Sequence, residues 1–304
     1  MTKIIIFTDP HFVPEGEQII GLDPYARLLT GIRHVNRFHA DAAQVVLMGD
    51  LSDSGDTPSY GRLRRILDEL KPPHRLMIGN HDHRQTFQEA FPEAMRDGNG
   101  FVQGVLDIGS RYRLLFLDTV NQPQHRSMDE RAGHLCRRRL GWLADQLATA
   151  RHRAVVIFLH HPPHATGFVG MDALRLCNET EFYRLLAAAG NVRHIFAGHV
   201  HRTISGSCRG IPFSIFKSPV HQQPMTFDLP DSSLSVDEPA AYGIVFLRRD
   251  GILVHTEDYE ISLGNEPVLD GKHERVGLGD SGPKDGPTSS YFHNPSKRRP
   301  ATRV

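Results

Sequence analysis

The sequence predicts an α/β fold, and three observations support this prediction. Short, continuous apolar segments typical of buried strands alternate with amphipathic segments typical of helices. Near the N-terminus the order is strand, helix, strand, helix, strand, which predicts parallel strands joined by right-handed crossovers. The chain has 304 residues, of which 39% are hydrophobic, enough for a large core in one or two domains.

The first three strands are expected where apolar and β-branched residues run without interruption. They are Lys3–Phe7, Val45–Met48 and Leu76–Ile78. A helix is expected to begin at Asp23-Pro24, because Asp is a good N-cap and Pro suits the first helical position. A second helix is expected from Pro58 to Leu70.

The rest of the chain is expected to add an antiparallel pair, two helices and further strands. Phe101–Asp107 and Arg111–Asp118 form the pair, and a helix with its apolar face at Leu135–Leu147 follows. The next helix runs from Asn178 to Ala189, with a capping box between Asn178 and Glu181. Five further strands are predicted at Val155–Leu159, His194–Ala197, Ile211–Phe216, Tyr242–Leu247 and Ile252–His255. The last three indicate a second, mostly antiparallel sheet.

The apolar pattern stops after Ser262. We therefore expect one domain over residues 1–262 and a largely disordered tail over 263–304, which is rich in Gly, Pro, Ser and charge. The cluster Lys297-Arg298-Arg299 could bind an anionic partner, but a solvated tail is the favoured interpretation.

Composition excludes several classes of protein. The formal net charge is +0, so neither a membrane surface nor a specific nucleic-acid partner is expected. The three cysteines, Cys136, Cys177 and Cys208, have no paired spacing and suit a reducing compartment. The N-terminal apolar run is too short for a signal peptide, and no run approaches the roughly 20 residues needed to span a bilayer. We expect a cytoplasmic protein.

Five of the predicted strands are each followed by residues that can bind a metal ion. These residues are Asp9 and His11, Asp50, Asn80 and His81, His160, and His199 and His201. Any one of them could be an ordinary turn or cap residue. Because the carboxyl ends of parallel strands meet at one edge of a sheet, the five sites together predict a shared centre.

The types of side chain indicate the metal. Carboxylate, imidazole and amide donors without thiolate do not fit a structural zinc site and suit Fe, Mn or Zn. There are more donors than one ion needs, which indicates two ions, as in enzymes that hydrolyse phosphate esters. One carboxylate would then bridge the ions, and Asp50 is the candidate.

These motifs resemble the metallophosphoesterase (calcineurin-like phosphoesterase) superfamily. The matching segments are Asp9-x-His11, Gly49-Asp50, Gly79-Asn80-His81-Asp82, His160 in His-His-Pro-Pro, and Gly198-His199-x-His201. Their order, with Pro219-Val220-His221-Gln222, is most similar to the bacterial class III cyclic-nucleotide phosphodiesterase and glycerophosphodiesterase branch. The resemblance implies a four-layer α/β/β/α sandwich of two mixed sheets.

The resemblance also implies the roles of the site residues. One metal ion would be held by Asp9, His11, Asp50 and His201, and the other by Asp50, Asn80, His160 and His199. Asn80, His81 and His221 would lie at the substrate, and Asp50 and His81 would take part in catalysis. Ser54 stands where this branch often has a cysteine, so a disulfide through that position is not expected.

Several functions remain open on the sequence alone. Cyclic nucleotides are the favoured substrates, and glycerophosphodiesters or a broad set of diesters are close alternatives. A non-catalytic scaffold on the same fold is a remote alternative, because a scaffold would be expected to have lost ligands or His81. We further expect the protein to be a homo-oligomer.

Overall fold

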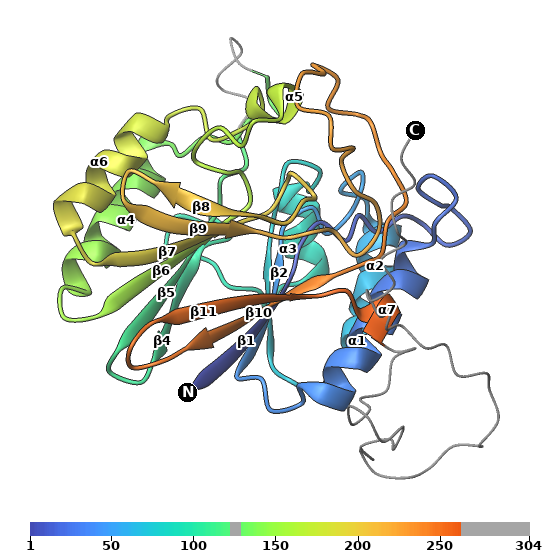
Figure 1. The fold of residues 1–304 in the computed structure, drawn as a ribbon, viewed down its shortest axis with the longest axis horizontal. Helices are drawn as coiled ribbons and strands as arrows, with labels where there is room; N and C mark the ends of the chain where they lie inside the picture. Colours follow the sequence, from blue (N-terminus) through green and yellow to red (C-terminus); the bar gives the residue numbers. More distant parts are fainter. Residues whose placement is uncertain (122–128, 263–304) are drawn as a thin grey trace, which may run out of the picture. The chain divides into compact units, whose positions relative to one another are not determined.

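Two stacked β-sheets form the centre of the molecule, and helices cover their outer faces (Figure 1). The computed structural model describes residues 1–121 and 129–262. The five-stranded sheet has the order β11-β10-β1-β2-β3, with β1 at Thr2–Phe7, β2 at Gln44–Met48, β3 at His74–Met77, β10 at Tyr242–Leu247 and β11 at Ile252–Glu257. The six-stranded sheet has the order β4-β5-β6-β7-β9-β8, with β4 at Gly104–Ile108, β5 at Tyr112–Leu117, β6 at Ala154–Leu159, β7 at Val192–Ala197, β8 at Ile204–Cys208 and β9 at Ile211–Ile215.

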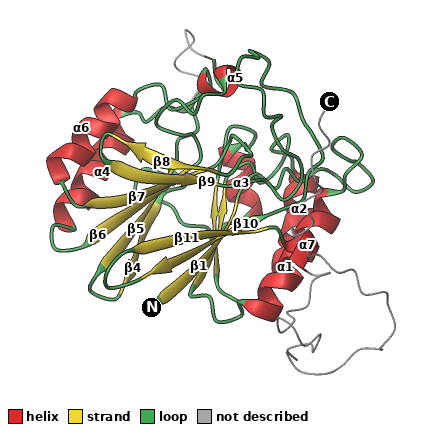
Figure 2. Ribbon diagram, in the orientation of Figure 1, coloured by secondary structure: helices red, strands yellow, loops and turns green. Residues whose placement is uncertain are grey.

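The helices divide into two groups, one on each outer face (Figure 2). Against the five-stranded sheet lie α1 (Pro24–Phe38), α2 (Thr57–Leu67), α3 (Arg84–Ala90) and α7 (Tyr259–Ser262). Against the six-stranded sheet lie α4 (Arg137–Thr149) and α6 (Glu179–Ala189), whereas the short α5 (Val169–Asp172) lies in the loop region after β6. The predicted α/β/β/α sandwich of two mixed sheets is therefore confirmed.

Both faces of the inner strands are buried, as continuous apolar runs predict. In β1, Ile4 and Ile6 pack between the sheets, whereas Ile5 and Phe7 pack against the helices. Phe158 of β6 lies at the centre of the layer between the sheets. Its ring centroid is 4.9 Å from that of Phe116 and 5.1 Å from that of Phe196. This aromatic row helps to fix one sheet on the other.

The prediction that the last strands form their own antiparallel sheet is wrong. Strand β10 pairs antiparallel with β1, with Ile5 opposite Ile244, and β11 extends that sheet. Strand β9 instead pairs in parallel with β7 in the other sheet. An apolar run identifies a strand but not its partner. The predicted metal-binding residues also do not follow strands of a single sheet. Strands β1, β2 and β3 belong to the five-stranded sheet, whereas β6 and β7 belong to the six-stranded sheet.

The predicted start of α1 is confirmed, since the Asp23 carboxylate accepts a hydrogen bond from the Tyr25 backbone N–H at 3.0 Å. The predicted capping box at α6 is wrong, although the helix itself is present. The Asn178 side chain bonds both the N–H and the carbonyl of Leu135, at 3.1 and 2.8 Å, so it joins two loops and does not cap α6.

Other element boundaries differ from the prediction. Helix α2 ends at Leu67 rather than Leu70, and the β4–β5 hairpin begins at Gly104 rather than Phe101. Four short elements, α3, α5, α7 and β8, were not predicted. The predicted tail over 263–304 lies outside the described residues. Within the described part of the chain, no helix is both long and apolar enough to cross a membrane.

Replacement of Phe158 by Ala is expected to lower the free energy of unfolding by about 3–5 kcal/mol, because it leaves a cavity between the sheets. Urea denaturation followed by circular dichroism measures the change. Leu253→Ala, at a side chain of β11 that is 43% exposed, is the matched control and should change it by less than about 0.5 kcal/mol. Equal small effects would show that the aromatic row does not hold the sheets together.

Candidate metal centre

The loops that follow β1, β2 and β7 place their metal-binding residues through an unusual backbone conformation. Among the described residues, seven other than glycine have positive φ angles, and five of them are predicted metal ligands. These five are Asp9, His11, Asp50, His199 and His201, with φ between 42° and 71°. Asp and His tolerate this left-handed region better than most residues, but it is still strained. Each of the three loops therefore turns sharply where a predicted ligand points inward.

The first group of donors consists of Asp9, His11, Asp50 and His201. Their donor atoms all lie within 4.8 Å of one another, and all four side chains are buried. His201 Nε2 is 3.1 Å from His11 Nε2 and 3.4 Å from Asp9 Oδ1. This is the set that the sequence predicted for the first ion.

The second group lies on the other side of Asp50. His160 Nε2 is 3.2 Å from Asn80 Oδ1 and 3.2 Å from Asp50 Oδ2. The ring nitrogens of His160, His161 and His199 form one group within 4.8 Å. His199 Nε2 is buried and has no hydrogen-bond partner, as a nitrogen aimed at a metal position would be. The same Asp50 Oδ2 is 3.7 Å from His11 Nε2, so this carboxylate lies between the two groups.

Three of the histidines are oriented by a hydrogen bond from Nδ1, which directs Nε2 into the centre. His201 Nδ1 donates to the His221 carbonyl at 3.0 Å, and His160 Nδ1 donates to the Met48 carbonyl at 3.1 Å. His11 Nδ1 donates to the Asp53 carboxylate at 3.1 Å. Bonds of this kind fix the tautomer and ring position of histidines that bind metals.

Asp53 was missed by the sequence analysis, although it follows Asp50 by only three residues. Besides His11, it contacts His81, whose Nδ1 donates to the Asp53 backbone carbonyl at 2.7 Å. The hydrogen bond from His11 is the main cause that lowers the pKa of Asp53, so its carboxylate stays ionised. The three-residue spacing from Asp50 did not predict this role, because Asp53 bonds to His11 and His81 and is not itself a proposed ligand.

His81 and His221 lie at the border of the first group, as predicted. The His11 ring is 4.7 Å from that of His81 and 5.2 Å from that of His221, centroid to centroid. The His81 side chain is 39% exposed, so solvent can reach it. His221 belongs to a group with His11 and His201 whose donor atoms lie within 4.8 Å, and its Nδ1 is buried without a partner.

Hydrogen bonds occupy both ring nitrogens of His161, the neighbour of His160, so neither nitrogen is open to a metal ion. Its Nε2 donates to the Arg131 carbonyl at 3.0 Å, and its Nδ1 accepts from the Thr119 hydroxyl at 2.7 Å. Burial and the nearby His160 lower the pKa of His161 to about 3, so the ring stays neutral. Its hydrogen bonds distinguish it from His199, whose Nε2 has no partner.

Asp82, the last residue of the Gly-Asn-His-Asp motif, joins two of the loops. Its buried carboxylate accepts hydrogen bonds from the backbone N–H groups of Leu51, Ser52 and Gly79 at 2.8–3.1 Å. It also accepts one from the Tyr60 hydroxyl at 2.8 Å. The loops that carry Asp50 and Asn80 are thereby held at a fixed separation.

Gly79 is required because there is no room for a side chain at this position, whereas its φ angle is not among the positive ones. A Cβ atom at this position would overlap Asp50 Oδ1 and would lie 2.7 Å from His160 Cε1. The glycine therefore allows the loop after β3 to approach the carboxylate between the two groups.

The charges of the site favour cations. Asp9 and Asp50 are buried carboxylates, and within the described residues their ion-pair partners are histidines only. Burial opposes ionisation, but nearby histidines, His201 for Asp9 and His160 for Asp50, lower the pKa of each carboxyl. Burial also opposes a charge on His160, yet the two carboxylates raise its pKa to about 9. Two buried carboxylates that have only histidine partners, and no Lys or Arg partner, among the described residues fit the binding of divalent ions.

Comparison with known proteins decides the family. The pattern of the calcineurin-like phosphoesterase family matches residues 2–203. A probable cyclic nucleotide phosphodiesterase of Rhodopseudomonas palustris is 40% identical over 285 residues, which cover 91% of this chain and 98% of that protein.

The chain belongs to the calcineurin-like phosphoesterase family.

Other relatives and a solved structure agree with this conclusion. The 3′,5′-cyclic adenosine monophosphate phosphodiesterase CpdA of Pseudomonas aeruginosa is 28% identical, over 71% of this phosphoesterase and 75% of that protein. The glycerophosphodiester phosphodiesterase GpdQ of Enterobacter lignolyticus is 27% identical, over 71% and 77%. A dimetal phosphatase of Danio rerio has the same fold, with a TM-score of 0.64 at 14% identity over 84% of this chain and 95% of that one.

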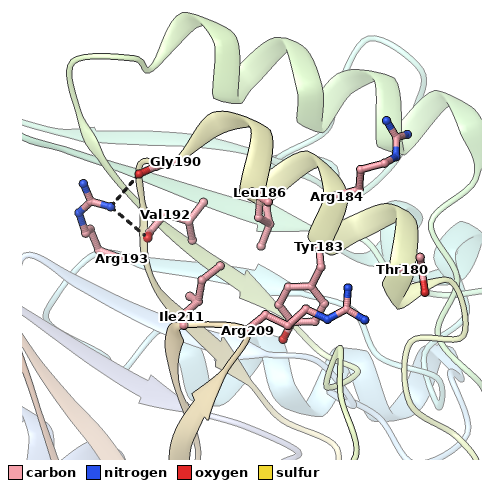
Figure 3. A pocket seen from close by; sticks show the side chains of 11 residues that line it. Thr180, Tyr183, Arg184, Leu186, Gly190, Val192, Arg193, Arg209 and Ile211 are labelled. Carbon is pink, nitrogen blue, oxygen red and sulfur yellow. Dashed lines mark hydrogen bonds between the residues drawn. The ribbon is translucent and has the colours of Figure 1, made fainter.

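A separate hollow lies along α6 of the phosphoesterase, beside the turn from β8 to β9 (Figure 3). Its volume is about 510 Å³, and Tyr183, Arg184 and Arg209 are among its lining residues. None of the predicted site residues lines it. The site predicted from the motifs and this hollow are therefore different places.

Gly79→Ala is expected to reduce the metal content of the protein, because the added methyl group displaces Asp50 or His160. Elemental analysis after reconstitution with Mn²⁺ measures this content. Gly61→Ala is the matched control, since a Cβ in that part of α2 would meet nothing within 4 Å. The control should keep its metal and be slightly more stable, by about 0.5–1 kcal/mol. Full metal content in Gly79→Ala would contradict the close packing described here.

Proposed function

We propose that this phosphoesterase hydrolyses phosphate diesters, cyclic nucleotides foremost, at a centre of two divalent metal ions. The single observation that carries the proposal is the position of Asp50, whose Oδ2 is 3.2 Å from His160 and 3.7 Å from His11. A carboxylate between two groups of donors is the arrangement that a bridging ligand requires.

The proposed ligands are those expected from the sequence. One ion takes Asp9, His11, Asp50 and His201, and the other takes Asp50, Asn80, His160 and His199. The unpartnered, buried Nε2 of His199 supports this assignment. When bound, such ions neutralise the phosphate and lower the pKa of water. The donor set suits Fe, Mn or Zn.

His81 is proposed as the acid that protonates the leaving oxygen. Its Nδ1 is engaged with the Asp53 carbonyl, which leaves Nε2 as the atom that hands over the proton. Burial acts against a charge on this ring, but Asp50 and the contacts with Asp53 raise its pKa above the usual value. A raised pKa favours the imidazolium form, which is the form that a general acid needs.

The substrate class rests on the relatives and on the lining of the site. Cyclic nucleotides are named for the Rhodopseudomonas and Pseudomonas proteins, and the first of these covers nearly the whole chain. A glycerophosphodiester is the second candidate, because the Enterobacter relative carries that name. His221 and Asn80 are proposed to contact the phosphoryl group, which a cyclic nucleotide and a glycerophosphodiester have in common.

A cytoplasmic homo-oligomer remains our expectation from the sequence. Cell fractionation tests the location, and sedimentation velocity tests the oligomeric state.

Asp50→Ala is expected to lower metal content from two ions per chain toward one or none, and to abolish turnover of cyclic AMP. Removal of the shared carboxylate weakens both sites at once. Elemental analysis and a phosphodiesterase assay, made on the same reconstituted sample, check both effects. The control is Asp250→Ala, at an exposed residue that should leave metal content and rate unchanged. Full activity of Asp50→Ala would exclude the bridging role.

His81→Ala is expected to keep its metal and to lower kcat by about 10²–10⁴-fold on substrates with poor leaving groups. Ribose and glycerol oxygens need a proton to depart, whereas nitrophenolate does not. The loss should therefore be much smaller on bis(p-nitrophenyl) phosphate. His255→Ala, an exposed histidine of β11, is the matched control. If both kinds of substrate lose the same factor, His81 acts by positioning and not as an acid.

A further inference from the structure

Two loops carry an exposed apolar surface, which we call the apolar tip. It consists of Val169, Met225, Phe227 and Leu229, which are 54%, 58%, 50% and 41% exposed. Seven large hydrophobic side chains are this exposed in the described part of the chain, and four of them lie here. Apolar side chains that gather in this way mark a binding surface more often than scattered ones do.

Both loops start at the metal centre. The first leaves His160 and His161 and is closed at its base by the bond from the Leu176 N–H to the Pro162 carbonyl, at 3.0 Å. The second leaves His221 and is closed by two bonds between Gln222 and Val236, each 2.9 Å. Phe227 is five residues beyond Gln222, so at most about 17 Å of extended chain separate it from the base of its loop.

The base of the second loop is tied directly to proposed metal ligands. The Ser218 hydroxyl donates to the Asp9 carbonyl at 2.7 Å, and His201 Nδ1 donates to the His221 carbonyl. Arg202 donates to the Gln223 carbonyl and forms a two-pronged ion pair with Glu238, with both distances 2.8 Å. The loop is therefore positioned by the same residues that position the metal ligands.

The two loops meet at their tips, where the contacts are close. The Val169 N–H donates to the Phe227 carbonyl at 3.2 Å, and the ring centroids of Phe168 and Phe227 are 4.8 Å apart. A Cβ on Gly170 would lie 2.6 Å from the Pro230 carbonyl oxygen, so only glycine allows this approach. Figure 1 shows α5 and the segment between β9 and β10 side by side. Phe227 is consequently held in place, with one side packed on Phe168 and half of its surface open.

The charge around the apolar tip selects what can bind there. Asp228 and Asp231 are exposed beside Phe227 and Leu229. These carboxylates repel a phosphate from the tip, so the phosphate of the substrate would bind at the metal centre and not here. The tip therefore suits an uncharged group with an apolar face.

We infer that the apolar tip binds the nucleobase of the substrate, with Phe227 as the stacking surface. The inference rests on the proposed hydrolysis of cyclic nucleotides and names the residues that select them over other diesters. A fixed aromatic ring with an open face provides a stacking surface for a flat base, and such stacking typically changes affinity by about 5- to 150-fold. A glycerophosphodiester has no base and would gain nothing from this surface.

The test compares two substrates that share the reacting group and differ in the base. They are 3′,5′-cyclic AMP and ribose 3′,5′-cyclic phosphate without a base. The preference is the ratio of their kcat/KM values, measured on the metal-reconstituted full chain. Phe227→Ala and Met225→Ala should each reduce this preference, Phe227→Ala by at least about fivefold, through kcat/KM for cyclic AMP alone.

Control variants separate stacking from a general disturbance. Phe227→Tyr keeps the aromatic ring and should restore the preference, and Leu253→Ala, on the edge strand β11, should leave it unchanged. Thermal melts show whether the variants remain folded.

Two results would overturn the inference while leaving the proposed function in place. One is an unchanged preference in Phe227→Ala and Met225→Ala, with wild-type hydrolysis of cyclic AMP. The other is an equal loss on both substrates together with a change in sedimentation coefficient, which would make the tip an interface between copies of the chain. Failure of the wild type to hydrolyse cyclic AMP would overturn the proposed function itself and the inference with it.

Discussion

The architecture of the site depends on two buried carboxylates, Asp9 and Asp50, that must be matched by positive charge. A buried carboxylate without a partner is very unfavourable, and no Lys or Arg of the described chain pairs with either one. Histidines surround them, with Nε2 atoms directed inward by hydrogen bonds at Nδ1. Two buried carboxylates that lack a Lys or Arg partner are an arrangement that favours the binding of divalent ions.

The same constraint explains the strained loops. Five of the proposed ligands adopt positive φ angles, each at a cost on the order of 1 kcal/mol, and the sum of these costs is comparable with the net stability of a domain. Strain of this size persists only on a rigid base. The interlocked layer around Phe158 and the four hydrogen bonds to Asp82 provide it, because they fix the two sheets and the loops between them.

Much of the site could be predicted from sequence, but less of what supports it. Asp9, Asp50 and His199 follow strands that are recognisable as apolar runs, and their residue types indicate metal chemistry. Asp53 acts through hydrogen bonds to His11 and His81, and its position in the sequence did not indicate this role. Asp82 belongs to a recognised motif, but the hydrogen bonds by which it joins two loops could not be predicted. The close packing around Gly79 could not be predicted either, because crowding by Asp50 exists only in three dimensions.

Strand pairing was the other limit of prediction. The local sequence identified β9, β10 and β11 as strands, yet β9 belongs to the six-stranded sheet and β10 and β11 belong to the five-stranded sheet. The choice depends on distant partners such as β1 and β7. Asn178 is a similar case, since Leu135, which is far away in sequence, competes successfully for its side chain.

The central claim is that two metal ions lie on opposite sides of Asp50. Anomalous diffraction from crystals of the manganese-reconstituted protein tests it most directly. The account predicts two peaks, one surrounded by Asp9, His11 and His201, the other by Asn80, His160 and His199, with Asp50 touching both. A single peak, or peaks away from Asp50, in fully reconstituted and active protein would contradict it.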